Sequence, residues 1–285
     1  MPSPLIQELW TYPVKSLGGI RLQEARLGIE GIEADRMWAV TAGTGEILTQ
    51  RDLPAMATIR LSLDEERLTL STAQGDPLRV SLRSARGAAA IVSVWGSRCE
   101  VTDEGDAASR WLTSVLGSWR GGELHLVRFD EGSRRSVDPE RLGDGRAFTR
   151  LADAYPYLIT ATASLELLSQ RLTEQGCTPI AMTRFRPNIV LEGTAPFEEE
   201  RLASVVAAAG GVQFDLMKRC KRCSVTMVDQ TSGERTLPAG EPLRTLASLN
   251  DDPNQKGAYF GMRAILATGA GTTLRRGDPV TIHLR

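Results

Sequence analysis

The chain has 285 residues, 41% of them hydrophobic and 24% charged, a length that suits one large domain or two smaller ones. Its 34 basic and 35 acidic side chains nearly cancel, so neither nucleic acid nor an anionic membrane surface is expected as a partner. Four cysteines are too few for a disulfide scaffold and fit a reducing compartment. Neither a signal peptide nor an apolar run of the ~20 residues that span a membrane is apparent, so a cytoplasmic location is expected.

The first hundred residues predict short strands joined by tight turns. Residues 39–50 have apolar positions on both sides of a Thr44-Gly45 turn, and residues 59–72 predict an antiparallel hairpin about the acidic turn at 64–66. The segments PLRVSL and AAIVSVW continue the pattern. Strands this short and closely spaced favour a barrel or a sandwich over a parallel sheet.

Helices are expected in three places. Asp106–Leu116 has apolar residues at helical spacing, with Asp106 as the expected N-cap and Gly117 as a stop. A second helix is predicted over Ser164–Gln175, and a third after Pro196, ending at Gly210-Gly211. The segments NIVLEG, CSVTMVD and TLRRGDPVTIHL predict further strands.

Residues 131–146 are polar and rich in glycine and charge, which is typical of a connecting loop. They are predicted to mark the boundary between two domains, 1–130 and 131–285. The whole pattern predicts an α+β protein with two β-rich domains, each with packed helices.

The most informative stretch is Lys-Arg-Cys-Lys-Arg-Cys at 218–223. Cations this close to a thiol favour the thiolate, the form that binds soft metals or attacks as a nucleophile. Arg and Lys side chains also hold phosphate and other anions. The hexamer therefore predicts a site that binds a metal through sulfur and grips an anionic cofactor. A solvated basic turn with incidental cysteines is the alternative.

Four other stretches combine a cation with a residue that fixes the backbone, namely YPVKS, DRMW, TQR and RFRPN. An isolated Arg beside a strand is usually a solvated rim charge, so each stretch alone is weak evidence. Cys99 and Cys177 lie apart from any cluster and are interpreted as structural, and the five tryptophans as barrel core or rim. His125 and His283 complete no recognisable zinc spacing.

Together with the hexamer, these stretches resemble MOSC-domain proteins that carry an N-terminal MOSC β-barrel domain. This group includes the mitochondrial amidoxime-reducing components and their bacterial relatives. The resemblance is carried, in family order, by YPVKSLGG, GIEADRMWAV, TQRDLPAM, WLTSVLG, DAYPYLITATASLELL, RFRPNIVLEG, CKRCSVTMVD-x-x-x-GE, FGMRAI and RRGDPV. It runs from residue 12 to residue 280 and implies an N-terminal MOSC β-barrel followed by a MOSC β-barrel domain.

The resemblance implies a molybdenum cofactor, a pterin dithiolene with a terminal phosphate, held between the two domains. Cys223 would be the catalytic thiolate ligand to molybdenum, and Lys221 and Arg222 would line the cofactor beside it. Cys220 is left open as a second thiol near the metal or a small buried residue.

The other residues that the resemblance implies for the cofactor come from four separate stretches. Arg186 and Asn188 would bind the pterin and phosphate region, and Asp153 would lie on a loop that faces the cofactor. The residues implied to contact the phosphate end are Lys15, Ser16, Arg36 and Arg51.

The resemblance further implies a two-electron reduction of the N–O bond in a small N-hydroxylated substrate, which gives the amine or amidine and water. The sequence has no flavin or dinucleotide fingerprint, and two of its four cysteines are already assigned to the molybdenum site. Neither an intrinsic flavin nor an iron–sulfur cluster is therefore expected. Since the ferredoxin tail and the membrane anchor of some relatives are not apparent, electrons are expected from a separate donor protein, ferredoxin-, flavodoxin- or cytochrome b5-like with its reductase.

Two other functions fit some of the same residues. A dithiol oxidoreductase could use Cys220 and Cys223, but thioredoxin-like CxxC pairs open a helix, whereas CSVTMVD predicts a strand. A carrier of molybdenum cofactor or of sulfur, with Cys223 as persulfide acceptor, would need much the same residues and stays open. Turnover with a reductant and an N-hydroxylated compound would separate a reductase from a carrier.

Overall fold

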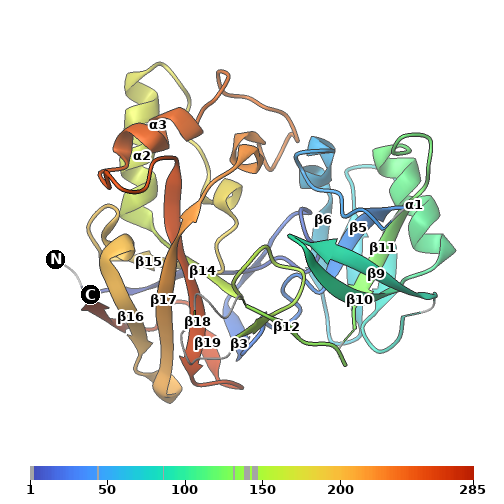
Figure 1. Cartoon of the computed structure of the whole chain (residues 1–285), viewed down its shortest axis with the longest axis horizontal. Coiled ribbons are helices and arrows are strands. Elements are labelled where there is room, and N and C mark those ends of the chain that lie inside the picture. Colours follow the sequence, from blue (N-terminus) through green and yellow to red (C-terminus); the bar gives the residue numbers. More distant parts are fainter. Residues whose placement is uncertain (1–2, 44, 86, 131, 138–141, 143–146) are drawn as a thin grey trace.

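The computed structural model describes residues 3–43, 45–85, 87–130, 132–137, 142 and 147–285. Figure 1 shows two β-rich halves side by side, one with helix α1 (Asp106–Leu116) and the other with helices α2 (Thr162–Glu174) and α3 (Leu243–Leu249). The predicted α+β class with two β-rich domains is confirmed. In this described part of the chain, every helix is too short or too polar to cross a bilayer.

One half is built on an eight-stranded sheet in the order β2-β1-β15-β14-β18-β17-β16-β20. Only β14 and β15 pair in parallel among the described strands of this sheet. The strands are β1 (Leu5–Thr11), β2 (Ile20–Leu22), β14 (Tyr157–Ala161), β15 (Ile189–Glu192), β16 (Leu202–Ala207), β17 (Val212–Lys221), β18 (Tyr259–Thr268) and β20 (Val280–Leu284). Backbone hydrogen bonds from Val280 to Pro4 and from Ile6 to Asp278 join the starts of β1 and β20 and curl this sheet toward closure.

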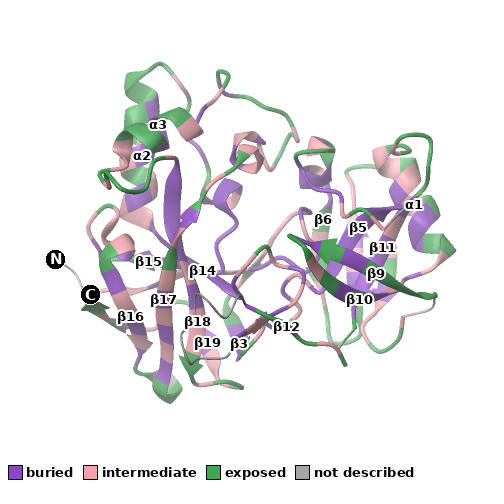
Figure 2. Ribbon diagram, in the orientation of Figure 1, coloured by how far each residue is buried: buried purple, intermediate pink, exposed green. Residues whose placement is uncertain are grey.

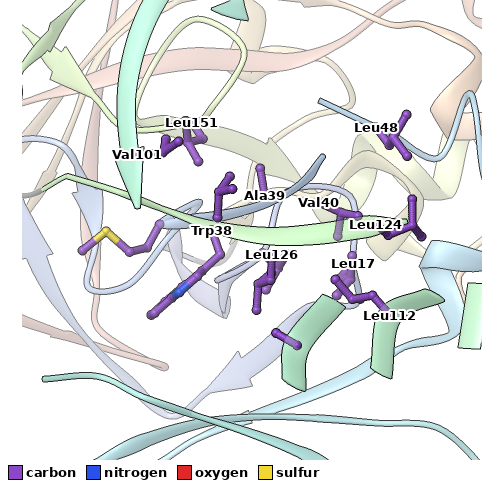
Figure 3. Close-up of a cluster of buried hydrophobic side chains, with 14 of the residues drawn as sticks. Leu17, Trp38, Ala39, Val40, Leu48, Val101, Leu112, Leu124, Leu126 and Leu151 are labelled. Atoms are coloured by element: carbon purple, nitrogen blue, oxygen red, sulfur yellow. The ribbon is translucent and has the colours of Figure 1, made fainter. Parts of the chain in front are cut away.

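The other half contains two smaller sheets. The four-stranded sheet has the order β5-β11-β10-β9, with β5 (Trp38–Ala42), β9 (Ala89–Val94), β10 (Ser97–Asp103) and β11 (Leu124–Phe129). The three-stranded sheet consists of β6 (Arg60–Leu63), β7 (Arg67–Ser71) and β8 (Leu78–Ser81). Between them and α1 lies a core in which Trp38, Val40, Leu112 and Leu126 are buried, as Figure 3 shows.

The chain crosses between the halves more than once. Strands β1 and β2 come from the first 22 residues, yet they pair in the large sheet beside β15. Strand β3 (Glu24–Gly28) pairs with β4 (Gly31–Ile32) and with β19 (Thr273–Arg275), while β12 (Arg135–Ser136) pairs with β13 (Phe148–Thr149). The predicted boundary at 130/131 adjoins residues outside the described ranges and stays a prediction.

Several local predictions are confirmed. The hairpin at 59–72 is present as β6 and β7, and the Asp64 carboxylate accepts the backbone N–H groups of Glu66 and Arg67 in its turn. The two helices predicted near 106–116 and 164–175 are α1 and α2. Asp106 is not the N-cap, however, because Gly105 occupies that position. The Gly105 backbone N–H donates a hydrogen bond to Asp103 Oδ1. Of the predicted turn at 44–45, Thr44 lies outside the described residues, as does most of the 131–146 loop.

The helix predicted after Pro196 is wrong. The chain forms a single 3-10 turn at Glu198–Arg201 and then the strand β16. Leu202 and Val205 are both buried, three positions apart, and this spacing is typical of a helix. It occurs in a strand here because the pairing of β16 with β20 shifts register between Leu202 and Ser204. A β-bulge adds one residue to a strand and so imitates a helical period over a short segment.

The strand predicted at CSVTMVD is also wrong. Strand β17 ends at Lys221, and Ser224–Met227 forms a 3-10 turn in which Thr226 donates to the Cys223 carbonyl from its backbone N and its hydroxyl. The β-branched residues of this segment favour strands in general, but these local hydrogen bonds stabilise a turn. Helix α3 was not anticipated. In the described residues, the other 3-10 helices lie at Pro54–Thr58, Met182–Phe185 and Ala209–Gly211.

In the large sheet, buried residues from several strands form one apolar cluster that includes Tyr157, Ile159, Phe214 and Met262, and β14 is buried at every position. Figure 2 shows this burial along β14, β17 and β18, with exposed residues on α2 and α3. The ends of several of these strands, together with the loops beside β5 and η1 (Pro54–Thr58), surround a cavity between the halves.

Candidate functional site

The cavity between the halves is lined by residues from widely separated stretches of sequence. All ten predicted site residues line it, although their roles remain predictions. These ten are Lys15, Ser16, Arg36, Arg51, Asp153, Arg186, Asn188, Lys221, Arg222 and Cys223. Each lies at the end of a strand or in a loop, so the sheets fix where these side chains meet.

The two thiols of the hexamer lie in different surroundings. Cys223 follows the end of β17, is exposed, and lines the cavity. Cys220 is buried, and its Sγ accepts a hydrogen bond from Arg222 Nη1 at 2.9 Å. The pairing of β17 with β18 shifts register between Arg219 and Lys221, a bulge of the kind that redirects side chains beside functional sites. Cys223 is therefore the thiol available to a ligand, while Cys220 helps to position Arg222.

Arg222 is held from three directions. Its backbone N–H donates to the Ala258 carbonyl at 2.9 Å, and its Nη2 donates to the Phe185 carbonyl at 2.6 Å. The Nε–H group of the guanidinium is buried and has no hydrogen-bond partner among the described residues. A buried donor without a partner costs about 1–3 kcal/mol, so an acceptor at this position would stabilise the site.

Arg36 and Arg186 both stack on the buried ring of Tyr12, with their Cζ atoms 4.5 and 4.3 Å from its centroid. Arg186 Nη1 donates to the Leu17 carbonyl, whereas its buried Nη2 has no partner in the described part of the chain. Burial, and then the charge of Arg36, lower the pKa of Arg186 to about 10. Two cations held this close without an equal number of acids form a site for an anion.

Asn188 lines the cavity, and its amide is engaged within the protein. It is 1% exposed, and its Nδ2 donates to the Trp10 carbonyl. Its Oδ1 accepts from the Leu158 backbone N–H at 3.1 Å and from Arg36 Nη1 at 3.2 Å. Because these contacts occupy its amide, Asn188 is best described as a positioning residue that ties β1, β14 and Arg36 together.

Lys15 and Asp153 form an ion pair at the cavity wall, and Lys15 Nζ also donates to the Leu151 carbonyl at 3.0 Å. Burial lowers the pKa of Lys15, although Asp153 acts in the opposite direction. Burial alone would raise the pKa of Asp153, but the Lys15 charge and hydrogen bonds from Lys15 and Trp95 hold that pKa well below its usual range. Asp153 is therefore a carboxylate at neutral pH, and its side chain is half-exposed at the cavity.

The backbone at this site is unusual. Seven non-glycine residues in the described part of the chain have a positive φ, and three of them are the predicted site residues Ser16 (67°), Arg36 (48°) and Arg186 (56°). Such conformations cost about 1–3 kcal/mol each and cluster at functional sites, where the surrounding structure enforces them. Their concentration around one cavity is independent support for its function.

Some lining residues were not singled out from the sequence. Arg263 lies on β18, opposite Lys218 of β17, and faces the same cavity. It stands in the FGMRAI stretch, where a cation in an otherwise apolar strand was the available signal. Thr49 and Tyr155 also line the cavity.

The residues present fit an anionic cofactor that carries a metal. Among the described lining residues, seven cationic side chains face one carboxylate, that of Asp153. The two unpartnered guanidinium N–H groups of Arg186 and Arg222 are donors suited to phosphate or pterin acceptors. Cys223 offers one thiolate ligand of the kind that soft metals prefer. In the described residues, no three His, Cys, Asp or Glu side chains are grouped as a metal site.

Comparisons with known proteins agree with this geometry. The MOSC N-terminal beta barrel domain matches residues 3–119, and the MOSC domain matches residues 148–281. Human mitochondrial amidoxime-reducing component 1 is 32% identical over 96% of this chain and 82% of its own length, and the mouse protein is 31% identical over 96% and 81%. Molybdenum cofactor sulfurase from rice is 30% identical over 85% of this chain, which corresponds to 30% of that protein.

Proposed function

Because the chain belongs to the family of MOSC-domain proteins that includes the mitochondrial amidoxime-reducing components, we propose that it is a molybdenum-cofactor-dependent reductase of small N-hydroxylated compounds. The reaction cleaves an N–O bond: R–NH–OH, two electrons and two protons give R–NH₂ and water. The observation that carries the proposal is the cavity in which the exposed Cys223 lies among seven cationic side chains.

The chain's own residues divide into those that hold the cofactor and those that face the substrate. Arg186, Arg36 and Lys15 would hold its phosphate end, with Ser16 and Arg51 beside them, and Cys223 would be the protein ligand to molybdenum. Lys221 and Arg222 would line the pterin next to that ligand. When bound, the cofactor supplies the two-electron redox chemistry, while the protein supplies binding, orientation and electrostatics.

Asp153 is the group placed to bind the polar part of the substrate. The Asp153 carboxylate can accept a hydrogen bond from the N–H or O–H of a substrate, which would orient the N–O bond in the cavity. Lys15, which pairs with Asp153, keeps this carboxyl group ionised because its charge lowers the pKa of Asp153.

Electrons would come from a separate donor protein. Four cysteines are present, and Cys223 and Cys220 are both engaged at the cavity, which leaves two thiols for any cluster. A typical iron–sulfur cluster takes four protein ligands. The proposal therefore includes a ferredoxin-, flavodoxin- or cytochrome b5-like partner with its reductase, as the sequence resemblance implies.

The test combines metal analysis with turnover. Purified protein should contain molybdenum and release a fluorescent pterin, and it should reduce benzamidoxime to benzamidine with reduced viologen dye as the electron source. Cys223→Ser should abolish that turnover, whereas Cys220→Ser should keep a measurable fraction because Cys220 acts only through Arg222. Wild-type turnover by Cys223→Ser with the cofactor bound would show that the ligand assignment is wrong.

A carrier of cofactor or sulfur is the second candidate, and the match to a molybdenum cofactor sulfurase favours it. The same cavity could hold a cofactor for delivery, with the exposed Cys223 as the sulfur acceptor. A metal-loaded protein that reduces neither benzamidoxime nor 6-hydroxylaminopurine, but restores activity to a cofactor-free molybdenum enzyme, would support the carrier over the reductase.

A further inference from the structure

A second cavity, of about 200 Å³, opens beside the first and shares part of its wall. Lys15, Thr49, Arg51 and Asp153 line both cavities. The wall of the second cavity is completed by Ile47, Ser93, Val94 and Trp95, all from the half that contains α1. Figure 1 shows the hairpin of β9 and β10 in this half, with its tip directed toward the other half. The cofactor cavity thus continues into a smaller space with an apolar side.

Trp95 occupies the tip of that hairpin, and the turn does not favour it. Val94 and Ser97 pair across a two-residue loop in which Trp95 has a φ of 51° and Gly96 a φ of 85°. Two positive φ values define the type I′ turn, which strongly prefers Asn, Asp or Gly at its first central position. A bulky residue there costs stability, and strain of this kind is concentrated at functional positions.

Burial does not compensate for this strain, because Trp95 is 69% exposed. The side chain is nevertheless held in place. The Arg51 guanidinium lies 5.6 Å from the indole ring centroid, and Asp153 lines the same cavity as Trp95. Trp95 has a positive φ, as do Ser16, Arg36 and Arg186 at the neighbouring cavity. A strained, exposed and fixed aromatic ring at the wall of a cavity presents its surface to a ligand rather than to the core.

We propose that Trp95 forms the aromatic wall of a substrate subsite, which takes the planar aryl or heteroaryl part of an N-hydroxylated substrate while its N–OH group reaches the shared wall at Asp153. The volume is sufficient, since an apolar protein cavity of about 150 Å³ binds benzene. Lys15 and Arg51 on the same wall disfavour cations, so the preferred ligand is a neutral aromatic compound such as an aryl amidoxime. This subsite rests on the proposed reductase function and adds to it a selectivity for aromatic over aliphatic substrates.

The test uses Trp95→Asn and Trp95→Phe in the molybdenum-loaded protein, with Ile91→Asn as the matched control. Ile91 is an apolar residue of the adjacent strand β9 that is 51% exposed and lies outside the second cavity. Binding of benzamidoxime and of acetamidoxime is measured by calorimetry without any reductant, alongside thermal stability, molybdenum content and released pterin. Trp95→Asn should be at least as stable as the wild type, because Asn suits the type I′ turn.

The expected result is a benzamidoxime Kd about 3- to 10-fold higher in Trp95→Asn, the range that one aromatic stacking contact supplies, with a smaller change for acetamidoxime. Trp95→Phe should recover most of the benzamidoxime affinity, and Ile91→Asn should change neither Kd. Equal losses for both ligands, or no preference of the wild type for benzamidoxime, would overturn the proposal. So would destabilisation of Trp95→Asn, which would make the residue structural, or loss of pterin, which would place Trp95 against the cofactor.

The binding measurement also separates this proposal from the one on which it rests. If the wild type binds benzamidoxime through Trp95 but does not reduce it with viologen dye, the subsite stands and the reductase assignment fails. If reduction proceeds while the Trp95 variants bind and turn over both ligands like the wild type, the reductase assignment stands and the subsite fails.

Discussion

Arg186→Gln should weaken cofactor binding strongly while changing the stability of the cofactor-free protein only slightly. Arg186 is buried, stacks on Tyr12, and carries one guanidinium N–H without a partner in the described residues, while Arg36 lies on the same ring. If the role of Arg186 is to hold an anion, this cation should add little to the stability of the cofactor-free protein. The substitution removes the charge and keeps an amide able to donate to the Leu17 carbonyl.

The magnitude follows from the structure. The lowering of the Arg186 pKa to about 10 corresponds to roughly 3 kcal/mol by which the cofactor-free fold disfavours the charged form. The substitution relieves that penalty but loses a stacking contact of about 1 kcal/mol and part of a charged hydrogen bond worth about 1.5–3 kcal/mol. The free energy of unfolding of cofactor-free Arg186→Gln should therefore lie within about 1 kcal/mol of the wild type.

Cofactor retention should respond very differently. Loss of charged hydrogen bonds to the phosphate or pterin should cost about 1.5–3 kcal/mol, or roughly ten- to 150-fold in affinity. The assays are denaturant unfolding of protein made in cells that cannot synthesise the cofactor, and molybdenum and pterin content of protein from normal cells.

Arg219→Gln is the matched control. Arg219 also stacks on a tyrosine, Tyr259, but Glu200 pairs with it at 2.6 Å, so its removal leaves a buried carboxylate unpaired and should cost about 3–5 kcal/mol of stability. If Arg186→Gln destabilises the cofactor-free protein as much as Arg219→Gln does, Arg186 is a structural residue and the reasoning is refuted.

Two further predictions concern pH and electron supply. Burial raises the pKa of Glu199 to about 8, so the folded state holds a proton that the unfolded chain releases above pH 4.5. The contribution of Glu199 to the free energy of unfolding is largest below pH 4.5 and falls by about 1.4 kcal/mol per pH unit up to pH 8. In urea unfolding, Glu199→Gln should make the free energy of unfolding depend less on pH over this range. An unchanged pH dependence would contradict the argument. The isolated chain should be inert with NADH and active with reduced viologen dye, and robust NADH-driven turnover by the metal-loaded chain would contradict the need for a separate donor.

The members of the cavity were predicted from the sequence, while their roles stay predictions. The resemblance of the stretches around residues such as Arg36 and Arg186 to a known family carried this information, and the structure brings these residues together. Asn188 shows the limit, because its amide is occupied by Trp10, Leu158 and Arg36, contacts from three distant segments that no local pattern encodes. Arg263 was passed over for a similar reason, since one cation in a strand does not reveal which face it takes.

The errors in secondary structure have a common physical origin. Leu202 and Val205 gave a helical spacing because a bulge interrupts β16, and the β-branched letters after Cys223 predicted a strand where hydrogen bonds to the Cys223 carbonyl form a turn. Irregularities of this kind depend on partner strands and on the cavity beside them, and these are tertiary features. Trp95, interpreted with the other tryptophans as barrel core or rim, lies in the turn between β9 and β10 and is 69% exposed.

The route of the first strand has a consequence for how the protein is made. Strand β1 has β2 as one neighbour, but its other neighbour is β15, and Ile6 pairs there with Leu191, so β1 is synthesised roughly 180 residues before that neighbour. At 5–20 residues per second, β1 lacks its second partner for on the order of 10–40 seconds. The strand that leads into Lys15 and Ser16 can be placed only after β15 has been synthesised, and Cys223 follows about thirty residues later. The cavity is thus assembled near the end of synthesis, and the cofactor can meet a complete site only once both halves are joined.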